Sequence, residues 1–250
     1  MKKHIKLIVF LLALLLVFIT YNSFSKESKK INYIALGDSI AEGMNSYSIV
    51  DYGYTDYIKD YLKDKDLLSF YTKKYAVSGY KIRDLVNDIE DNKVVEQDDK
   101  KIYLKEALRE SDLVTLTIGA NDFLEMLSLD NIDETISNAK NTKKEIDKIL
   151  EKEKDTIILI KKFAKRQIIV TGYFNPFPRL AKYKKNIDEL VKYYNNNLNE
   201  LCDELEVDFV DIFEILDSNE KAFPNPLNIH PNKYGYELIY KEVAKKIKLP

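Results

Sequence analysis

The sequence has few of the residues on which several classes of protein depend. It contains one cysteine, Cys202, and cannot form an intrachain disulfide; this residue shares the apolar face of a predicted helix, where we expect a buried thiol. It has 7 glycines in 250 residues, and none belongs to a glycine-rich dinucleotide or phosphate-binding loop. Acidic and basic side chains nearly balance, at 41 and 39, and no basic face interleaved with aromatic residues predicts a nucleic-acid partner. These absences exclude a disulfide scaffold and argue against a nucleotide-binding or nucleic-acid-binding protein.

The amino-terminal segment differs in composition from the rest of the chain. Two lysines at its start precede an almost uninterrupted apolar run over 5–20, a pattern typical of a secretory signal or a short membrane anchor. No small-residue cleavage site follows, which favours an uncleaved anchor with its lysines inside the cell. We therefore expect residues 1–24 to be a signal peptide or membrane anchor, 25–30 a linker, and 31–250 one domain outside the cytoplasm.

From residue 31 onwards, strand patterns alternate with helix patterns. We predict strands at 32–36, within 68–77, and at 112–118, 167–172 and 207–212. The stretch 112–118 is β-branched at most positions, as in a strand buried on both faces. Amphipathic spacing predicts helices at 55–63, 81–92, 102–108, 130–165, 180–205 and 236–247. The stretch 130–165 is expected to be helical in one piece or two, with its charges on a solvated face, and 213–226 is expected to be irregular. The alternation predicts an α/β fold, with a parallel sheet between helices, and neither repeats nor a second domain.

Chemically capable residues follow successive predicted strands. Ser39 comes after the first strand, Gly79 after the second and Asn121 after the third. His230 lies between the fifth strand and the last helix. Because the carboxyl ends of parallel strands meet at one edge of a sheet, we expect these residues to converge.

Ester chemistry assigns each converging residue a role. Ser39 would attack the acyl carbon, and His230 would take its proton and return it to the leaving alcohol. The oxyanion would receive hydrogen bonds from the N–H groups of Ser39 and Gly79 and from the Asn121 amide. Purely structural roles compete, because these residue types also cap helices and form turns. His230 favours the functional interpretation, since the only other histidine of the sequence, His4, lies in the amino-terminal segment.

The blocks around these residues, taken in order, resemble those of the SGNH or GDSL hydrolase family. They are Gly37-Asp38-Ser39, Ser78-Gly79, Gly119-Ala-Asn-Asp122 and His230-Pro-Asn-Lys-Tyr-Gly235. The resemblance extends over residues 32–249. It implies a three-layer α/β/α sandwich of flavodoxin-like type with a five-stranded parallel sheet, and esterase or lipase chemistry that needs no metal or cofactor. Within the family, the chain looks most like secreted or membrane-anchored lysophospholipase-L1-like esterases of Gram-positive bacteria.

One position departs from the family pattern. The family commonly has an aspartate three residues before the histidine, where this chain has Leu227, and the neighbouring Asn228 cannot supply a charge. We expect a main-chain carbonyl of the loop before His230 to accept the Nδ1–H, so that Asn228→Ala has little effect and turnover is modest. A carboxylate from elsewhere, such as Asp217 or Glu220, is the alternative.

These observations favour a serine esterase acting on a lysophospholipid, a short-chain ester or an O-acetyl group of an envelope glycan. Aromatic residues near the predicted strand ends would line its acyl pocket, namely Tyr47, Phe123, Phe174 and Phe177. A non-catalytic carbohydrate- or lipid-binding module of the envelope is the alternative, suggested by the missing aspartate. A flavin or nucleotide binder is disfavoured, because the charge of Asp38 would repel phosphate. The expected partners are thus an acyl-ester substrate and, through residues 1–24, a membrane.

Overall fold

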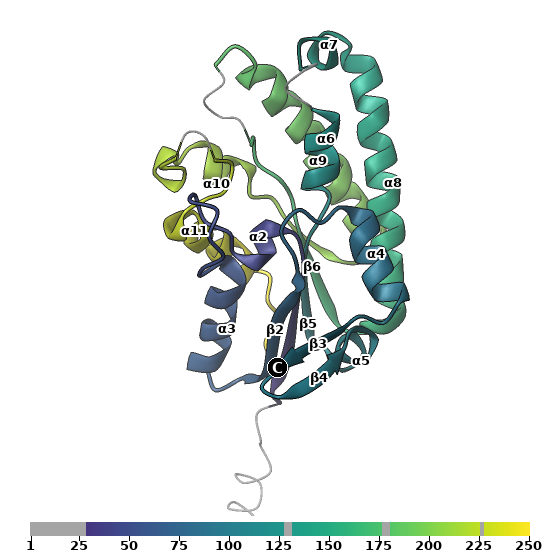
Figure 1. Ribbon diagram of the computed structural model, residues 1–250, viewed down its shortest axis with the longest axis vertical. Helices are drawn as coiled ribbons and strands as arrows, with labels where there is room; N and C mark the ends of the chain where they lie inside the picture. The colour runs from purple at the N-terminus through teal and green to yellow at the C-terminus, as the bar shows by residue number, and fades with distance from the viewer. Residues whose placement is uncertain (1–28, 128–131, 177–180, 226–227) are drawn as a thin grey trace, which may run out of the picture. The chain divides into compact units, whose positions relative to one another are not determined.

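A five-stranded parallel sheet in the order β2-β1-β5-β6-β7 forms the centre of residues 31–249 (Figure 1). The computed structural model describes residues 29–127, 132–176, 181–225 and 228–250. The strands of the sheet are β1 (Ile31–Gly37), β2 (Leu68–Ala76), β5 (Leu113–Thr117), β6 (Gln167–Thr171) and β7 (Asp208–Val210). Each overlaps one of the five stretches predicted as strands, so the predicted sheet is confirmed.

Helices cover both faces of the sheet, and the side chains of β1 alternate between the two. Tyr33 and Ala35 pack on one face, Ile34 and Leu36 pack on the other, and all are fully buried. The first face is covered by α2 (Ser39–Glu42), α3 (Tyr54–Asp64) and α11 (Lys233–Ala244). The second is covered by α4 (Ile82–Glu90), α5 (Leu104–Glu110), α6 (Ala120–Met126), α7 (Ile132–Ser137), α8 (Ala139–Phe163) and α9 (Lys184–Glu204). The predicted three-layer sandwich is therefore confirmed (Figure 1).

The register of the sheet brings three strand ends level with one another. Gly37, the last residue of β1, pairs with Ala76 at the end of β2 and with Thr117 at the end of β5. The turns that leave these strands therefore start side by side. These turns contain three of the predicted site residues, which explains how positions far apart in the sequence reach one place.

A two-stranded hairpin was not predicted from the sequence. It consists of β3 (Val94–Gln97) and β4 (Lys100–Tyr103), joined by Asp98 and Asp99. Both aspartates have positive φ, 51° and 59°, as a two-residue hairpin turn requires, but the usual Asn-Gly or Asp-Gly signal is missing. The predicted helix 102–108 begins two residues later, as α5, because β4 takes its first two positions.

Two further expectations are corrected along the chain. The helical stretch 130–165, expected as one piece or two, forms the two helices α7 and α8, but not all of its charged residues face solvent, since Glu153 is fully buried. The stretch 213–226, expected to be irregular, contains α10 (Phe213–Asp217) and the short 3-10 helix η2 (Glu220–Ala222). Both pieces pack their apolar residues against the core beside α11.

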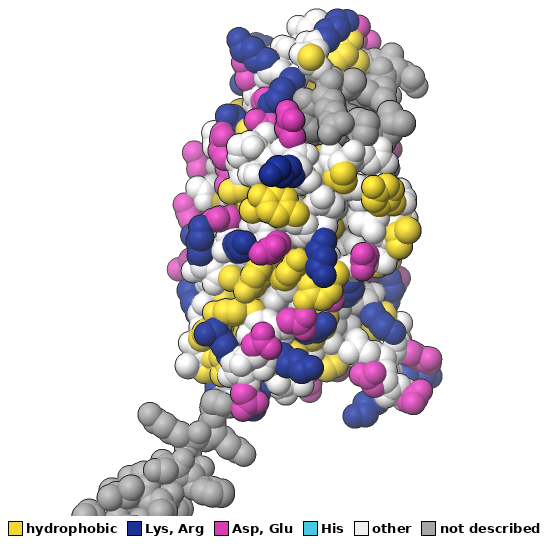
Figure 2. Space-filling view, turned by 90° about the vertical axis from the view of Figure 1, so that its left-hand side faces the viewer, with side chains coloured by type: hydrophobic (Ala, Val, Ile, Leu, Met, Phe, Trp, Pro, Cys, Tyr) yellow, Lys and Arg dark blue, Asp and Glu magenta, His cyan; other side chains and the backbone are white. Residues whose placement is uncertain are grey.

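The surface over α3 and α11 has no dominant charge. Figure 2 shows basic and acidic side chains interspersed on this face, with apolar side chains between them, in keeping with the near balance of charges in the sequence. Within the described ranges, no helix is both long and apolar enough to cross a membrane. The predicted signal peptide or anchor, residues 1–24, lies outside those ranges, as does most of the predicted linker 25–30.

Candidate active site

Ser39 lies at the carboxyl end of the interior strand β1. Gly37 ends this strand with a φ of +134°, and a Cβ atom there would lie 2.0 Å from the main-chain oxygen of Thr117, so the close approach of β5 requires glycine. Asp38 then caps α2, because its Oδ1 accepts a hydrogen bond of 3.0 Å from the N–H of Ile40. The strand end and the cap together place Ser39 in the first turn of the helix, 9% exposed.

His230 contacts Ser39 through one ring nitrogen and Asn228 through the other. Its Nε2 lies 2.8 Å from Ser39 Oγ, and its Nδ1 lies 2.8 Å from Asn228 Oδ1. The main-chain N–H of His230 donates to the same Oδ1 at 2.9 Å. A main-chain N–H can only donate, so the shared acceptor is the amide oxygen, and Nδ1 must carry the ring proton. Nε2 is then free to accept the hydroxyl proton of Ser39, as a general base must.

The acceptor for Nδ1 is a side chain, which corrects the expectation of a main-chain carbonyl. Asn228 folds back on the N–H two residues later, a turn that asparagine commonly forms, and the same oxygen meets the imidazole. Asp217 is instead paired with Lys184 at 2.6 Å. Leu227 lies outside the described residues. Asn228 was not predicted to orient His230, because asparagine lacks a charge. The turn preference of Asn-x-His is the signal that would have identified it.

The loop between α2 and α3 holds the histidine loop in place. Asn228 Nδ2 donates to Ser48 Oγ at 2.9 Å, and Ser46 Oγ donates to the main-chain oxygen of His230 at 2.9 Å. Asn225 Nδ2 donates to the main-chain oxygen of Ser46, also at 2.9 Å. These contacts join segments about 180 residues apart in the sequence. They fix both the amide of Asn228 and the position of the imidazole, and none was predicted.

Gly79 follows β2 in a conformation that favours glycine. Its φ is +83°, and a Cβ atom there would meet nothing within 4 Å, so the backbone angle and not the space requires glycine. The preceding Ser78 donates its N–H to Glu42 Oε2 at 2.8 Å, which links this turn to the end of α2. The second block is thus joined to the helix that begins at Ser39.

Two hydrogen bonds join the third block to the segment that directly follows the second block. Asn121 Nδ2 donates to the main-chain oxygen of Tyr80 at 2.8 Å, and Asp122 Oδ2 accepts from the N–H of Ile82 at 2.9 Å. An amide nitrogen carries two hydrogens, so Asn121 retains one that can be given to a ligand. The structure therefore places the Asn121 amide beside the turn of Gly79, as an oxyanion hole shared by both would require.

Ser39, Asn121 and His230 line one cavity of about 40 Å³. Its walls are mainly apolar and include Phe123 and Phe174, two of the predicted pocket residues. Among the described residues that line it, neither Gly79 nor Tyr47 appears, and Tyr47 is 69% exposed. Phe177 lies outside the described residues. The structure thus brings together three of the four predicted chemical residues at one cavity and places the turn of Gly79 beside it.

Burial changes the protonation of two groups beside the nucleophile. It lowers the pKa of His230 below its usual value of 6.5, so the imidazole is neutral and ready to accept a proton at pH 7. It raises the pKa of Asp38 to about 7, and the nearby charge of Asp122 acts in the same direction, while main-chain hydrogen bonds oppose it. The base is therefore available near neutral pH.

Comparison with known proteins identifies the family to which this site belongs. The model of the GDSL-like lipase/acylhydrolase family matches residues 35–238. The chain belongs to this family. All four blocks lie inside the matched range, and a member of this family is an ester hydrolase. The expected SGNH or GDSL resemblance is thereby confirmed.

Relatives of this GDSL-family chain agree in extent and fold. The uncharacterized protein YpmR of Bacillus subtilis (strain 168) is 28% identical over 228 residues, which cover 90% of this chain and 84% of that protein. The lipase Lip_vut3 from a goat rumen metagenome superposes with a TM-score of 0.68 at 17% identity, covering 86% of this chain and 97% of that one. Axe2, an acetylxylan esterase from Geobacillus stearothermophilus, gives a TM-score of 0.61 at 18% identity, covering 90% and 97%. The two structures show that the whole domain has the fold of these enzymes.

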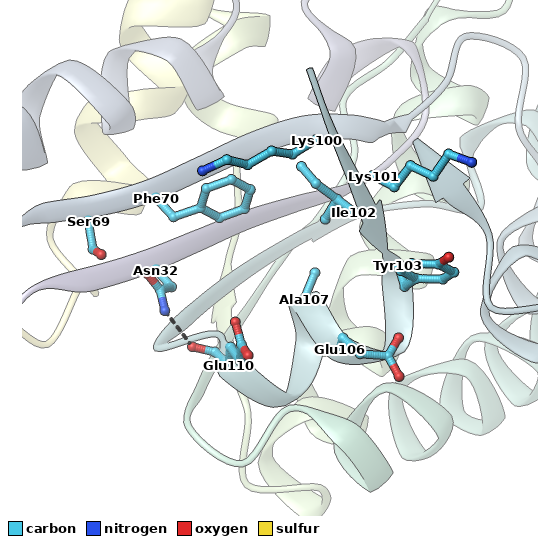
Figure 3. Close-up of a pocket in the computed structure, with 10 residues that line it drawn as sticks. All are labelled: Asn32, Ser69, Phe70, Lys100, Lys101, Ile102, Tyr103, Glu106, Ala107 and Glu110. Atoms are coloured by element: carbon cyan, nitrogen blue, oxygen red, sulfur yellow. Dashed lines mark hydrogen bonds between the residues drawn. The ribbon is translucent and has the colours of Figure 1, made fainter. Parts of the chain in front are cut away.

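A larger hollow, of about 440 Å³, lies at the opposite end of the sheet (Figure 3). It is bordered by the start of β2, by β4 and by α5, and Figure 3 shows the Asn32 amide donating to the main-chain oxygen of Glu110 on its floor. It contains none of the predicted site residues. Among the described residues, no cluster of histidine, cysteine, aspartate and glutamate could hold a metal ion. The smaller cavity, with its serine, histidine and asparagine, is therefore the candidate active site.

Proposed function

We propose that the protein is a serine ester hydrolase in which Ser39 is the nucleophile and His230 the general base. The observation that carries this proposal is the 2.8 Å contact between Ser39 Oγ and His230 Nε2, with the opposite ring nitrogen held by Asn228. A nucleophile, a base and a group that orients the base form the arrangement from which activated serines are recognised. Membership of an acylhydrolase family supports the same conclusion.

The first half of the reaction forms an acyl-enzyme. Ser39 Oγ attacks the acyl carbon while its proton passes to His230 Nε2, giving an imidazolium that keeps its Nδ1–H on Asn228. The oxyanion that develops accepts hydrogen bonds from the main-chain N–H groups of Ser39 and Gly79 and from the free hydrogen of Asn121 Nδ2. As the tetrahedral intermediate collapses, Nε2–H gives its proton to the leaving alcohol oxygen.

The second half repeats these steps with water. A water molecule attacks the acyl carbon, His230 Nε2 accepts its proton, and the same donors stabilise the new oxyanion. Collapse breaks the bond to Ser39 Oγ, returns the proton to it and releases the carboxylic acid. The base is ready at neutral pH because burial keeps the pKa of His230 below its usual value.

The side chain that orients His230 is an amide and not the usual carboxylate, which changes how well the imidazolium is stabilised. Asn228 fixes the tautomer of His230 through its oxygen, but it cannot offset the positive charge of the imidazolium as a carboxylate would. In a protease triad, replacing aspartate by asparagine lowers kcat by about 10⁴, largely through the wrong tautomer. Here the tautomer is correct, because the main-chain N–H orients the amide, so the loss is smaller and turnover is modest.

The substrate we propose is a carboxylic ester with a small or single-chain acyl group. Lysophospholipids, short-chain esters and O-acetyl groups of envelope glycans share this bond. The apolar walls of the cavity suit the acyl part, and the structural neighbours include a lipase and an acetylxylan esterase. A non-catalytic binding module would have no need of the Ser39–His230 contact, which favours the enzyme.

We further propose that the enzyme works outside the cytoplasm, anchored to the membrane or secreted. The apolar run over 5–20 behind two lysines supports this placement. Fractionation of the native host should find the protein in the membrane or the medium. Full-length protein recovered from the cytosol would contradict this proposal without affecting the chemistry.

A chain-length series of chromogenic esters tests the proposed activity. The full-length protein should hydrolyse at least one of them, and Ser39→Ala should abolish turnover while leaving the folded state intact. Ser69→Ala is the matched control, because this exposed serine lies at the amino end of β2, and it should keep full activity. Turnover that survives Ser39→Ala would refute the assignment of the nucleophile.

A further inference from the structure

Glu153, on α8, is an acid buried in the core behind the active site. Its side chain is fully buried, and the hydroxyl of Tyr194 on α9 donates to its Oε2. Within the described residues, its Oε1 has no hydrogen-bond partner and the group has no ion pair. An ionised carboxylate in such surroundings is strongly disfavoured, because no opposite charge replaces the water that it loses. The geometry therefore favours the neutral acid.

The acid lies against the start of the third block. Gly119 precedes α6 with a φ of +106°, and a Cβ atom built there would lie 2.8 Å from Tyr194 Oη, 3.0 Å from Tyr173 Oη and 3.4 Å from Glu153 Oε2. Three oxygens thus crowd the space that a side chain at Gly119 would need, two residues before Asn121. Tyr173 also lines the active-site cavity. Glu153 therefore supports the segment that presents the side-chain donor of the proposed oxyanion hole.

In the part of the chain that the structure describes, none of the groups that act electrostatically on Glu153 is a cation that would offset the cost of its burial. These titratable groups are Asp122 on α6, Asp38 before α2, Tyr173 after β6, and Tyr194 and Cys202 on α9. On its own helix, Lys152 acts on Asp122. Burial raises the pKa of Glu153 to about 8; the hydrogen bond from Tyr194 opposes this, and the charges of Asp122 and Asp38 add to it. The charges around Glu153 thus act in the same direction as its burial.

We propose that Glu153, held in its neutral form, is a positioning residue for the oxyanion-hole segment from Gly119 to Asn121. This proposal rests on the esterase function proposed above. A neutral carboxyl accepts the hydrogen bond from the Tyr194 hydroxyl and packs against Gly119. It does so without placing a negative charge behind the developing oxyanion. Ionisation would repel that oxyanion and disturb the contact with Gly119 at the same time. The enzyme then loses transition-state stabilisation when Glu153 gives up its proton.

The pH dependence of kcat separates this role from a merely structural one. In the wild-type protein, kcat should fall by about tenfold as pH rises from 7 through 8 to 10, a part of the 10²–10³ that loss of one oxyanion donor costs. Glu153→Gln keeps the shape and the hydrogen-bonding capacity of the neutral acid but cannot ionise, so this fall should disappear. Glu151→Gln, an exposed position on the same helix, is the matched control and should retain the wild-type profile.

Two further readouts complete the experiment. Glu153→Ala should lower kcat at pH 7 by about tenfold with KM within about twofold, because the affected bonds strengthen in the transition state; Glu153→Gln should restore kcat. Infrared difference spectra of wild type against Glu153→Gln should contain the carbonyl band of a protonated acid at pH 7, and this band should fade above pH 8. The infrared readout does not depend on activity or on the folding of the alanine variant.

Two results would overturn the role proposed for Glu153. An alkaline fall in kcat that is identical in Glu153→Gln and in wild type would remove the acid from the reaction. Absence of the carbonyl band at pH 7 would refute the neutral form. If the wild-type protein hydrolyses no ester, the proposed function itself fails and the positioning role fails with it, whereas a failure confined to Glu153 leaves normal wild-type turnover.

Discussion

At the scale of single residues, Asn228 decides how the base is held. Its Oδ1 lies 2.8 Å from His230 Nδ1 and also accepts the main-chain N–H of His230. Asn228→Ala removes this acceptor and should lower kcat by about 10²-fold, the size expected when a catalytic group is misplaced. Asn228→Asp keeps the acceptor, adds a charge and leaves Ser48 able to turn its hydroxyl toward it, so kcat should rise. Steady-state kinetics on the best ester of the series measures both effects.

The same residue sets the acid limb of the pH profile. Burial lowers the pKa of His230 from its usual value of 6.5. Because only the neutral imidazole can accept a proton, activity should still be present just below pH 6.5 and should be lost on further acidification. In Asn228→Asp, the carboxylate stabilises the imidazolium and raises the pKa of His230, so the acid limb should move to higher pH. A limb that stays in place in this variant would show that position 228 does not contact the base.

Asn121 is predicted to act on the transition state. Asn121→Ala should lower kcat by about 10²–10³ with little change in KM, because the bond to the oxyanion strengthens as charge develops. Asn197→Ala is the matched control, since Asn197 on α9 likewise donates to a main-chain oxygen, that of Tyr193 at 2.7 Å, and does not line the cavity. A change in KM alone would make Asn121 a substrate-binding residue instead.

At the scale of elements, the glycine at the end of β1 is predicted to be indispensable for folding. Gly37→Ala would place a Cβ atom 2.0 Å from the main-chain oxygen of Thr117 at a φ of +134°. It should lower the free energy of unfolding by more than about 3 kcal/mol, through backbone strain and overpacking together. Gly79→Ala meets no such contact and should lower it by about 1 kcal/mol, the cost of a positive φ alone. Urea denaturation of the two variants compares them directly.

Strands and helices can be predicted from the sequence where their apolar runs are long. The three interior strands, β1, β5 and β6, are predictable because helices bury both faces of the sheet, which leaves near-continuous apolar sequence in these strands. The hairpin of β3 and β4 was missed because its residues are half-exposed or exposed and its turn is Asp98-Asp99. The charged pattern of α8 concealed Glu153, since periodicity cannot distinguish a solvated acid from one enclosed by α9 and the start of α6.

At the scale of the whole molecule, the site is formed by strand ends and loops that lie far apart in the sequence. Ser39 and His230 could be predicted because each follows from the order of strands in a parallel sheet. The contact of Asn228 with His230 and the hydrogen bonds from Ser46 and Ser48 could not, since they depend on two loops about 180 residues apart in the sequence. Sequence patterns specify the blocks, and the folded loops determine how the base is oriented.

Covalent labelling reports directly on whether Ser39 is a nucleophile activated by His230. A fluorophosphonate probe should label the folded protein once, and peptide mapping should place the label on Ser39. Labelling should vanish in Ser39→Ala, persist in Ser69→Ala and become much slower in Asn228→Ala, because the hydroxyl needs an oriented base. A label on another residue, or labelling that survives Ser39→Ala, would contradict the account.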